Sequence, residues 1–401
     1  TTPMVTKKKE RQNRKLLEGL PVVEVVIEPQ DLDLTKYKRI GEEHTRTLEF
    51  EPGKLYVKEI IRPKYGLKDN TALPQEYQDG IVIADLPLLP IYKGLPGASL
   101  LAEILLQKYE YHVPFYRQIR EFHHLCLKIP ENTLHGWFKP ACELLKPLYD
   151  ELKMQVLAVD YIQVDETTLP VIINKQSHKA VREYLGMVRA VTTGLVFFHY
   201  DDGSRSQETA RNLLEPFKGY LQSDGYAAYN IFEGKEGVFP VGCHAHIRRH
   251  YETAKEEISL RLNTFWLAKI QELYRIEQAV DIQGISPEMR MSKRQEQALP
   301  ILDELAQWME TTYPKVLPKS RMGQAIAYAY IFWPRTRNYL KDGRLKIDNN
   351  LAENAIRSIA LSKKTSCLVE IMRRRKTQLS SVHCWHHAKH LKLIPENGLP
   401  I

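Results

Sequence analysis

Cysteine is scarce in this chain, with five residues scattered among 401. An odd number at irregular spacing excludes a disulfide framework and favours a reducing, cytoplasmic environment. No apolar run reaches membrane-spanning length and no signal peptide is found, so no membrane partner is expected. The chain begins at Thr1 rather than at a methionine, which predicts that a natural N-terminal segment precedes it.

An excess of positive charge is the first feature that points to a partner. The formal net charge is +8, and 43% of the residues are apolar while 26% are charged. These values are typical of a globular protein with a polyanionic partner such as nucleic acid. The length exceeds that of an ordinary single domain, so two or three units with their own cores are expected.

Changes in residue pattern along the chain predict five segments. They are a basic arm and linker at 1–34, a small β-rich unit at 35–96, a helical region at 97–153, an α/β domain at 154–364 with a helix-rich stretch at about 251–343, and a tail at 365–401. In the β-rich unit, alternating polarity on both sides of Pro52 and Gly53 predicts an antiparallel hairpin.

Helical periodicity begins at Gly97 and predicts three short helices, with Trp137 on the inner face of the third. Two short helices and a turn fit a helix-turn-helix DNA reader, and a plain helical bundle fits equally well. On the first interpretation, the basic residues of this region are candidate DNA contacts. They are Lys108, Arg117, Arg120 and Lys128.

Apolar β-branched runs joined by tight turns predict a mixed α/β sheet in the second half of the chain. The run from Val156 to Val164 is expected to be a strand that ends on Asp165. A short strand at 220–223 is expected to deliver Asp224. Each aspartate would then lie at the end of a strand.

A later helix carries a third carboxylate. The helix opens at Asp348, Asn349 and Asn350, where either of the first two residues can cap the free N–H groups. Glu353 then lies in its first turns, and Arg357 shares the same face four residues on. An ordinary amphipathic helix with a surface ion pair is the alternative interpretation.

Asp165, Asp224 and Glu353 are therefore candidate metal ligands. Clustered carboxylates repel one another unless a cation lies between them. Two divalent ions roughly 3.5–4 Å apart are the usual device for activating water or a 3′-hydroxyl in phosphodiester chemistry. Other acids remain open as members of the set. They are Asp160, Glu166, Asp201, Asp202 and Asp348.

Several stretches, in one order, resemble the insertion-sequence-66 family of bacterial transposases. They include Arg39–Glu43, Arg62–Tyr65, Tyr116–Gln118, Asp165–Thr167, Gly219–Tyr226, Cys243–His246 with Arg248 and Arg249, and Asp348–Arg357. The resemblance runs from about residue 35 to Lys364. It implies a ribonuclease H-like mixed sheet with a helical insertion, and an acidic triad that maps onto Asp165, Asp224 and Glu353.

The resemblance also implies cofactors and partners. Mg²⁺ or Mn²⁺ would be the metal, and the partners would be double-stranded DNA of element ends and target, further copies of the chain on DNA, and accessory proteins of the same element. The candidate DNA contacts in this half are Arg248, Arg249, Arg357 and Lys363. Lys319, Arg321, Arg335 and Arg337 of the helical insertion either line DNA or form a solvated face. A nuclease without strand transfer and a transposase-derived repressor are the competing functions.

Two departures from the family limit what is carried over. Family members often have a cysteine-rich zinc-binding segment near Tyr65, but 64–69 contains no cysteine, so no zinc is expected there. Cys243 and His246 make only half a metal site and are interpreted as a buried cysteine and a histidine at a helix start.

The second departure is the tail after Lys364. Suitable codons for residues 365–376, read in a shifted frame, yield Asn-Phe-Leu-Phe-Gly-Gly-Asn-His-Glu-Ala-Ala-Glu, which resembles the family's continuation. The tail is therefore interpreted as the product of an altered reading frame. Because it places Arg373, Arg374 and Arg375 where small residues belong, we expect poor packing after Lys364 and weak or no activity.

Overall fold

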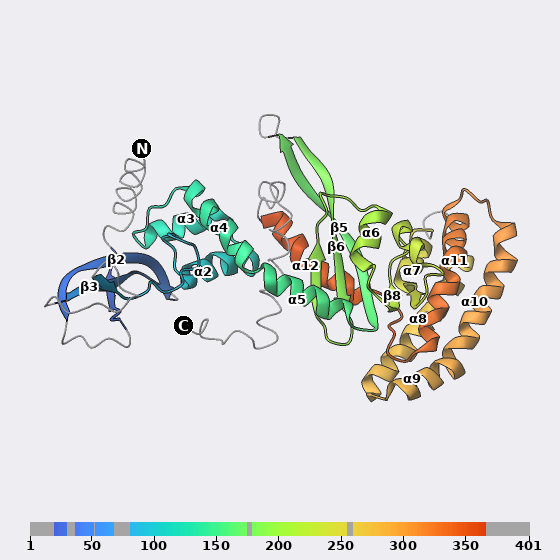
Figure 1. Cartoon of the computed structure of the whole chain (residues 1–401). Coiled ribbons are helices and arrows are strands. Elements are labelled where there is room, and N and C mark those ends of the chain that lie inside the picture. Colours follow the sequence, from blue (N-terminus) through green and yellow to red (C-terminus); the bar gives the residue numbers. More distant parts are fainter. Residues whose placement is uncertain are drawn as a thin grey trace. The chain divides into compact units, whose positions relative to one another are not determined.

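The computed structural model describes residues 20–29, 37–51, 53–67, 81–174, 179–254 and 260–365. The chain divides into two compact units, one up to Pro147 and the other from Leu148 to Lys363 (Figure 1). The predictions for the tail after Lys364 and for most of the basic arm fall outside the described residues.

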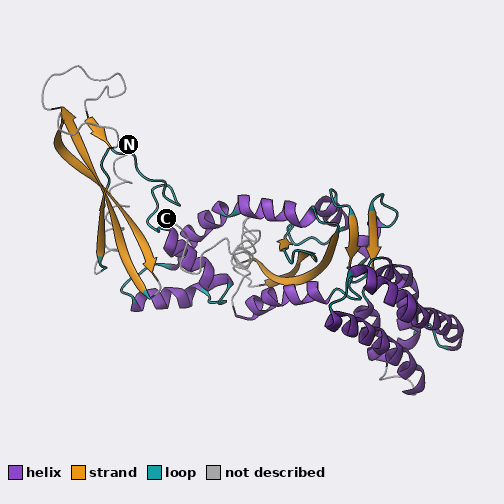
Figure 2. Cartoon of the chain, turned by 90° about the horizontal axis from the view of Figure 1, so that it is seen from below, coloured by secondary structure: helices purple, strands orange, loops and turns teal. Residues whose placement is uncertain are grey.

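A long antiparallel hairpin dominates the sheet of the first unit (Figure 2). The strands are β1 (Val22–Val26), β2 (Tyr37–Glu51), β3 (Lys54–Leu67) and β4 (Ile81–Ile83), with β2 and β1 on either side of β3 and β4 also paired with β3. Strands β2 and β3 pair from Glu51 opposite Lys54 onward. Gly53 has a φ of 76°, the left-handed conformation that a tight hairpin turn requires. The predicted hairpin is therefore present.

Three helices follow the sheet in the same unit. They are α2 (Ala98–Tyr109), α3 (Phe115–His124) and α4 (Glu131–Leu144). Each begins after a residue in an extended conformation, which is Pro114 for α3 and Pro130 for α4. Leu100, Leu101, Ile104 and Leu105 form a buried apolar stripe on α2, and Trp137 of α4 is buried as well. The helical region is thus confirmed.

The second unit is built on a five-stranded mixed sheet. Its strands are β5 (Tyr161–Asn174), β6 (Lys179–Ala190), β7 (Val196–His199), β8 (Gly219–Gln222) and β9 (Val238–Val241), in the order β7-β6-β5-β8-β9. β5, β6 and β7 run antiparallel, whereas β8 and β9 run parallel to β5. This is the ribonuclease H-like mixed sheet that was expected.

The predicted course of the first strand was wrong. Val156 belongs to helix α5 (Lys146–Leu157), where it extends an apolar stripe with Tyr149 and Leu152 and is fully buried. Strand β5 begins only at Tyr161 and continues through Asp165 to Asn174. The acid does not end the strand because β6 pairs with β5 along this whole length, with Met187 opposite Asp165.

The remaining helices lie around the sheet and in the insertion. They are α6 (Gln207–Leu214), η2 (Ala227–Phe232), α7 (His244–Ala254), α8 (Leu260–Gln283), α9 (Pro287–Lys293), the π-helical turn η3 (Arg294–Ala298), α10 (Leu299–Thr312), η4 (Tyr313–Lys315), α11 (Arg321–Arg337), η5 (Asn338–Lys341) and α12 (Asn350–Thr365). Helices α8 to α11 gather at one end of the unit, beyond β8 (Figure 1).

The helical insertion has its own apolar core, as its length required. Trp266, Ile270 and Leu273 of α8 are fully buried against Leu302 and Leu305 of α10. Their spacing along the sequence is that of one buried face of a helix. No helix among the described residues is long and apolar enough to cross a membrane.

Candidate active site

Alternation along two neighbouring strands brings the first two acids together. On β5, Ile162 and Val164 pack into the core formed with α5 and α6, so Asp165 points to the other side of the sheet. On β8, Leu221 packs into the same core. β5 and β8 are parallel, and their pairing runs up to Gln163 opposite Gln222. Asp165 and Asp224 each follow two residues later, so they occupy equivalent positions.

Asp165 lies in an environment that disfavours its charge. Burial is the main cause, and the nearby carboxylates of Asp224 and Glu353 add repulsion, so that the pKa of Asp165 is raised to about 7. A hydrogen bond from the Glu166 backbone N–H to Oδ1, at 2.8 Å, offsets part of this shift. A cation beside Asp165 would remove the repulsion.

Asp224 is held in a tight turn directly after β8. Its Oδ1 accepts the Tyr226 backbone N–H at 2.9 Å, and its backbone carbonyl accepts the Tyr328 hydroxyl at 2.6 Å. Gly225 has a φ of 94°, and a Cβ there would lie 2.8 Å from the Tyr328 hydroxyl and 3.0 Å from Phe332. The turn therefore needs glycine both for its backbone conformation and for the close approach of α11.

Glu353 lies in the first turns of α12 and is engaged by α7. Arg249 donates from Nη2 to both carboxylate oxygens, at 3.0 and 3.2 Å. His246 Nε2 lies 3.7 Å from Oε1 of the same carboxylate. Burial lowers the pKa of His246. The ion pair with Arg249 thus balances the charge of the third acid.

A fourth carboxylate, Glu166, adjoins the site from the opposite face of β5. It accepts a short hydrogen bond from the Tyr229 hydroxyl. The pKa of Glu166 is raised to about 7, mainly by burial, and the charges of Asp224 and Asp165 raise it further. Glu166 was left open as a ligand, and its charge is coupled to both aspartates.

Asp348, another acid left open, serves the start of α12. Its carboxylate accepts the Asn350 backbone N–H at 3.1 Å, the Asn350 side-chain amide at 2.8 Å and the Tyr274 hydroxyl at 2.7 Å. The side chain of Asn349, the alternative cap, is buried and has no hydrogen-bond partner within the described ranges. Asp348 is therefore a helix-start residue in this structure.

The carboxylates suit a hard divalent cation, since Mg²⁺ prefers oxygen ligands. Next to burial, the charges of Asp224 and Glu353 raise the pKa of Asp165, and a cation at this place would offset that repulsion. As the side chains stand, no three histidine, cysteine, aspartate or glutamate residues in the described part of the chain lie close enough to hold an ion. Glu353 is turned toward Arg249, so its side chain would have to leave that pair to join Asp165 and Asp224.

Cys243 and His246 take separate roles. Burial raises the pKa of the Cys243 thiol to about 12, and its sulfur accepts the Asn349 N–H at 3.4 Å. A thiol with so high a pKa is a poor metal ligand. His246 lies at the start of α7 and faces Glu353. The interpretation as a buried cysteine and a helix-start histidine fits both positions.

The predicted DNA contacts differ in exposure. The exposed ones are Arg117 and Arg120 on α3, Lys128 in the following turn, Arg249 on α7 and Arg357 on α12. Arg248 on α7 is partly buried, and the side chain of Lys363 is outside the described ones. Lys108 is buried over the Phe115 ring. Arg335 is also buried, where it bonds Glu233 and Asn230. Lys108 and Arg335 are therefore structural residues, and the open interpretation of each as a DNA contact was wrong.

Sequence reasoning missed two buried glutamines that adjoin the acids. Gln163 precedes Asp165 by two positions, and Gln222 precedes Asp224 by two positions. Both side chains are fully buried and bonded to each other at 2.8 Å. The repeated Gln-x-Asp pattern was the available signal, but it becomes meaningful only when the two strands are known to be adjacent.

The mixed sheet, its strand order and the helical insertion define a ribonuclease H-like core. Residues 93–373 match the family described as "Transposase IS66 family". The chain therefore belongs to the IS66 family of transposases. The match ends within the tail, at residue 373.

Three proteins of Sinorhizobium fredii (strain NBRC 101917 / NGR234) are similar to the chain. The uncharacterized protein y4jD is 28% identical over 366 residues, which cover 87% of this chain and 70% of the relative. The uncharacterized proteins y4qI and y4hP are 30% and 29% identical, and the alignments cover 65% and 64% of their lengths. The chain thus spans about two thirds of the length of these relatives.

Proposed function

We propose that the chain is a DNA transposase that cleaves the 3′ strand at element ends and joins the freed 3′-hydroxyl to target DNA. The observation that carries this proposal is the placement of Asp165 and Asp224 at equivalent positions of adjacent parallel strands, with Glu353 within electrostatic range. Two ends must be joined to one target, so at least two copies of the chain would act together, in the bacterial cytoplasm.

The three carboxylates would hold Mg²⁺ or Mn²⁺. The bound metal would supply an activated water and stabilise the leaving 3′ oxygen. The residues themselves do three things. Asp165 on β5 and Asp224 in the turn after β8 would supply fixed ligand oxygens, and Glu353 would complete the set from α12. Without a cation these charges would repel the phosphate backbone, so binding of DNA and binding of metal at this site are coupled.

Cationic side chains around the acids would receive the phosphates. Arg249 is about half exposed beside Glu353, with 55% of its side chain accessible. Arg357 is exposed on α12, one turn beyond Glu353. Each can neutralise a phosphate close to the scissile bond. A guanidinium is suited to this because it presents paired N–H donors to phosphate oxygens.

The first unit would bind the element ends. Arg117 and Arg120 are exposed on α3, and Lys128 is exposed in the turn that leads to α4. This placement fits the helix-turn-helix interpretation, in which such residues contact the phosphates beside a groove. Each phosphate contact should add about 0.9 to the slope of log affinity against log salt concentration.

The deciding experiment uses a supercoiled plasmid that carries the DNA flanking the gene as donor, a second plasmid as target, and the full chain with Mg²⁺ or Mn²⁺. Primer extension should map nicks to the element ends, and joined products should appear with the target. Asp165→Asn is the matched inactive control. Nicks without joined products would favour the nuclease, and end binding without nicks would favour the repressor. The absence of nicks, joined products and end binding would overturn the proposal.

A further inference from the structure

Two buried glutamines stand directly beneath the two aspartates. Gln163 and Gln222 are opposite each other in the parallel pairing of β5 and β8, and both are fully buried. Strand alternation places each of them on the same face as the aspartate two residues on. They therefore form the layer of side chains next to the acids.

Each glutamine has every polar group satisfied. Gln163 donates to Gln222 Oε1 at 2.8 Å and to the Asp348 carbonyl at 3.0 Å, and its own Oε1 accepts the Ala352 N–H at 3.1 Å. Gln222 donates to the carbonyls of Gly242 and Lys346, at 3.1 and 2.9 Å. A fully satisfied buried network of this kind has one arrangement rather than several.

Tyr161 lies on the same face of β5, two residues before Gln163, and belongs to the same network. Its hydroxyl donates to Gln222 Oε1 at 2.5 Å and accepts the Lys346 N–H at 2.9 Å. Most partners of the three side chains thus belong to one stretch, 346–352, which leads into α12. The Ala352 N–H, in the first turn of α12, donates both to the Asn349 carbonyl at 2.9 Å and to Gln163 Oε1 at 3.1 Å, so Gln163 adds an acceptor from the sheet at the helix start.

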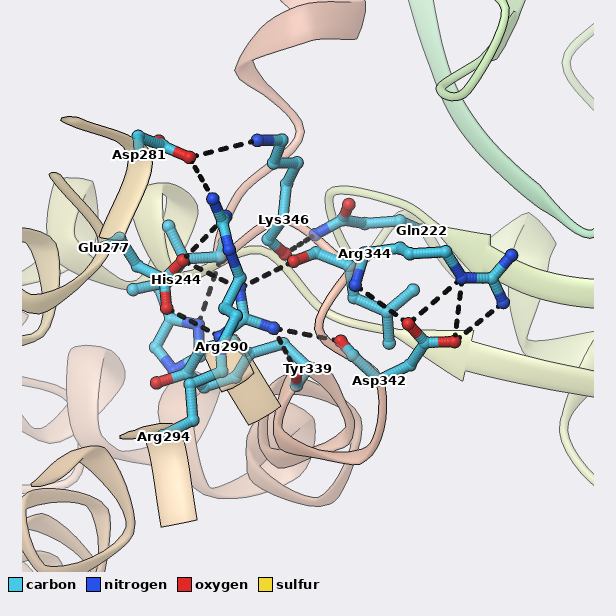
Figure 3. A network of polar contacts seen from close by, with 12 residues as sticks. Gln222, His244, Glu277, Asp281, Arg290, Arg294, Tyr339, Asp342, Arg344 and Lys346 are labelled. Atoms are coloured by element: carbon cyan, nitrogen blue, oxygen red, sulfur yellow. Dashed lines mark hydrogen bonds and ion pairs between the residues drawn. The ribbon is translucent and has the colours of Figure 1, made fainter. Parts of the chain in front are cut away.

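The chain just before this segment, at 339–345, is held by the insertion. Arg294, fully buried, donates to the carbonyls of Tyr339, Asp342 and Leu345, at 2.8, 2.9 and 2.8 Å. Figure 3 shows Gln222 directed at Lys346 while Arg294 reaches the chain at Tyr339 and Asp342. The segment before α12 is therefore fixed between sheet and insertion.

We propose that Gln163 and Gln222 are positioning residues that set where Glu353 lies relative to Asp165 and Asp224. This inference rests on the proposed metal-dependent cleavage. Gln163 bonds both Gln222 and the Ala352 N–H, and Gln222 bonds the Lys346 carbonyl just before α12. The two amides therefore fix the first turn of α12 relative to β5 and β8. Glu353 follows Ala352 directly, so a shift of that N–H moves the carboxylate.

The test uses Gln163→Met and Gln222→Met, which keep the length of the side chain and remove the amide. Residues that orient metal ligands typically contribute 10–100-fold to metal affinity or activity. We expect the half-saturating Mn²⁺ concentration, measured by electron paramagnetic resonance on the full chain, to rise about tenfold or more in each variant. Hydrogen exchange should accelerate over 346–356.

Two further variants separate positioning from loss of stability. Gln118→Met removes a buried glutamine of α3 that donates to the Ile104 and Val113 carbonyls, at 3.4 and 3.0 Å, in the other unit. It should lower the melting temperature without altering Mn²⁺ affinity. Tyr161→Phe removes only a hydroxyl from the network and should raise the half-saturating concentration by a smaller factor.

The outcomes distinguish the inference from the function on which it rests. Wild-type Mn²⁺ affinity in Gln163→Met and in Gln222→Met, with Mn²⁺ binding by the unmutated chain, would overturn the positioning role alone. Equal loss of affinity in Gln118→Met would also overturn it, since a general loss of stability would then suffice. Absence of Mn²⁺ binding and cleavage in the unmutated chain would overturn the proposed function itself.

Discussion

Arg249 and Glu353 face each other across α7 and α12, with two hydrogen bonds of 3.0 and 3.2 Å between guanidinium and carboxylate. The third acid of the site is thus paired with a cation from the polypeptide rather than directed at the two aspartates. A metal ion and a DNA phosphate would compete for these two partners, the metal for Glu353 and the phosphate for Arg249. This competition has a measurable consequence.

Replacing Arg249 by glutamine should release Glu353 and lower the half-saturating Mn²⁺ concentration in the absence of DNA. The same change should weaken DNA binding and reduce the salt slope by about 0.9 if one phosphate contact is lost. Arg248→Gln is the matched control, because Arg248 bonds Glu252, at 2.9 Å, one turn along the same helix. Identical Mn²⁺ affinities in the two variants would contradict the competition.

The three acids should be needed for cleavage and dispensable for end binding. Asp165→Asn, Asp224→Asn and Glu353→Gln each replace a carboxylate by an amide, which holds a divalent ion poorly. We expect cleavage to fall by at least about 10²-fold, as for a misplaced reacting group, while gel-shift affinity for element ends stays near wild type. A variant that keeps near wild-type Mg²⁺-dependent cleavage would show that its residue is misassigned.

The raised pKa of Asp165 predicts how stability depends on pH in the absence of metal. A carboxyl whose pKa rises from 3.8 to about 7 on folding binds more protons in the folded state. Its stabilising contribution is present below pH 3.8 and is lost as the pH rises through about 7. Glu166 acts in the same direction, since its pKa is raised to about 7 as well.

Asp165→Asn should therefore be more stable than the unmutated chain at pH 8 with a chelator present, and Mg²⁺ should stabilise only the unmutated chain. A difference of 1 kcal/mol would shift the melting temperature by about 2–4 °C in a domain of this size. Asp303→Asn is the control, because Asp303 is exposed and pairs with Arg337 at 2.7 Å. The interpretation fails if thermal unfolding shows the same pH profile for both variants.

Truncation of Arg294 should lower the free energy of unfolding more than truncation of most other residues. It is fully buried, pairs with Glu277 at 2.7 Å and satisfies three backbone carbonyls (Figure 3). Arg294→Met would leave the buried Glu277 with only the longer contact to Arg290, at 3.4 Å, among the described residues. Breaking a buried pair costs up to about 3–5 kcal/mol. Urea unfolding should show this loss.

The pair of the partly exposed Arg337 with the exposed Asp303 provides the comparison for Arg294. Arg337→Met should cost no more than about 1 kcal/mol, since exposed ion pairs contribute little. The double variant Arg294→Met with Glu277→Met should recover part of the loss, because no unpaired charge then remains buried. Equal costs for the two arginines would mean that the segment before α12 is not held by Arg294.

A further prediction concerns the tail after Lys364, which lies outside the residues that the structure describes. If residues 365–401 come from an altered reading frame, restoring the frame after Lys364 should increase cleavage. The in-frame helix is expected to pack beside α12 and steady Glu353, whereas Arg373, Arg374 and Arg375 cannot be buried cheaply. Sequencing the gene and comparing both proteins tests this. Equal activity, or an alternative frame without the glycine-histidine-alanine segment, would refute it.

The sequence by itself determined the features that depend on short-range patterns. The short strand that delivers Asp224, the helix that opens at Asp348 and carries Glu353, and the buried stripe of α8 all follow from spacing over a few residues. The resemblance added the ribonuclease H-like sheet, which is present. Such features are readable because each depends on neighbours within one or two turns.

Only the tertiary structure decided the rest, because the contacts involved join residues far apart in the chain. Strand β5 continues past Asp165 since β6 pairs with it, whereas the sequence pattern suggested an end there. Arg249 meets Glu353 across 104 positions, and Gln163 meets Gln222 across 59 and Ala352 across 189. No local pattern encodes such pairs, so burial and register had to bring them together before their roles could be recognised.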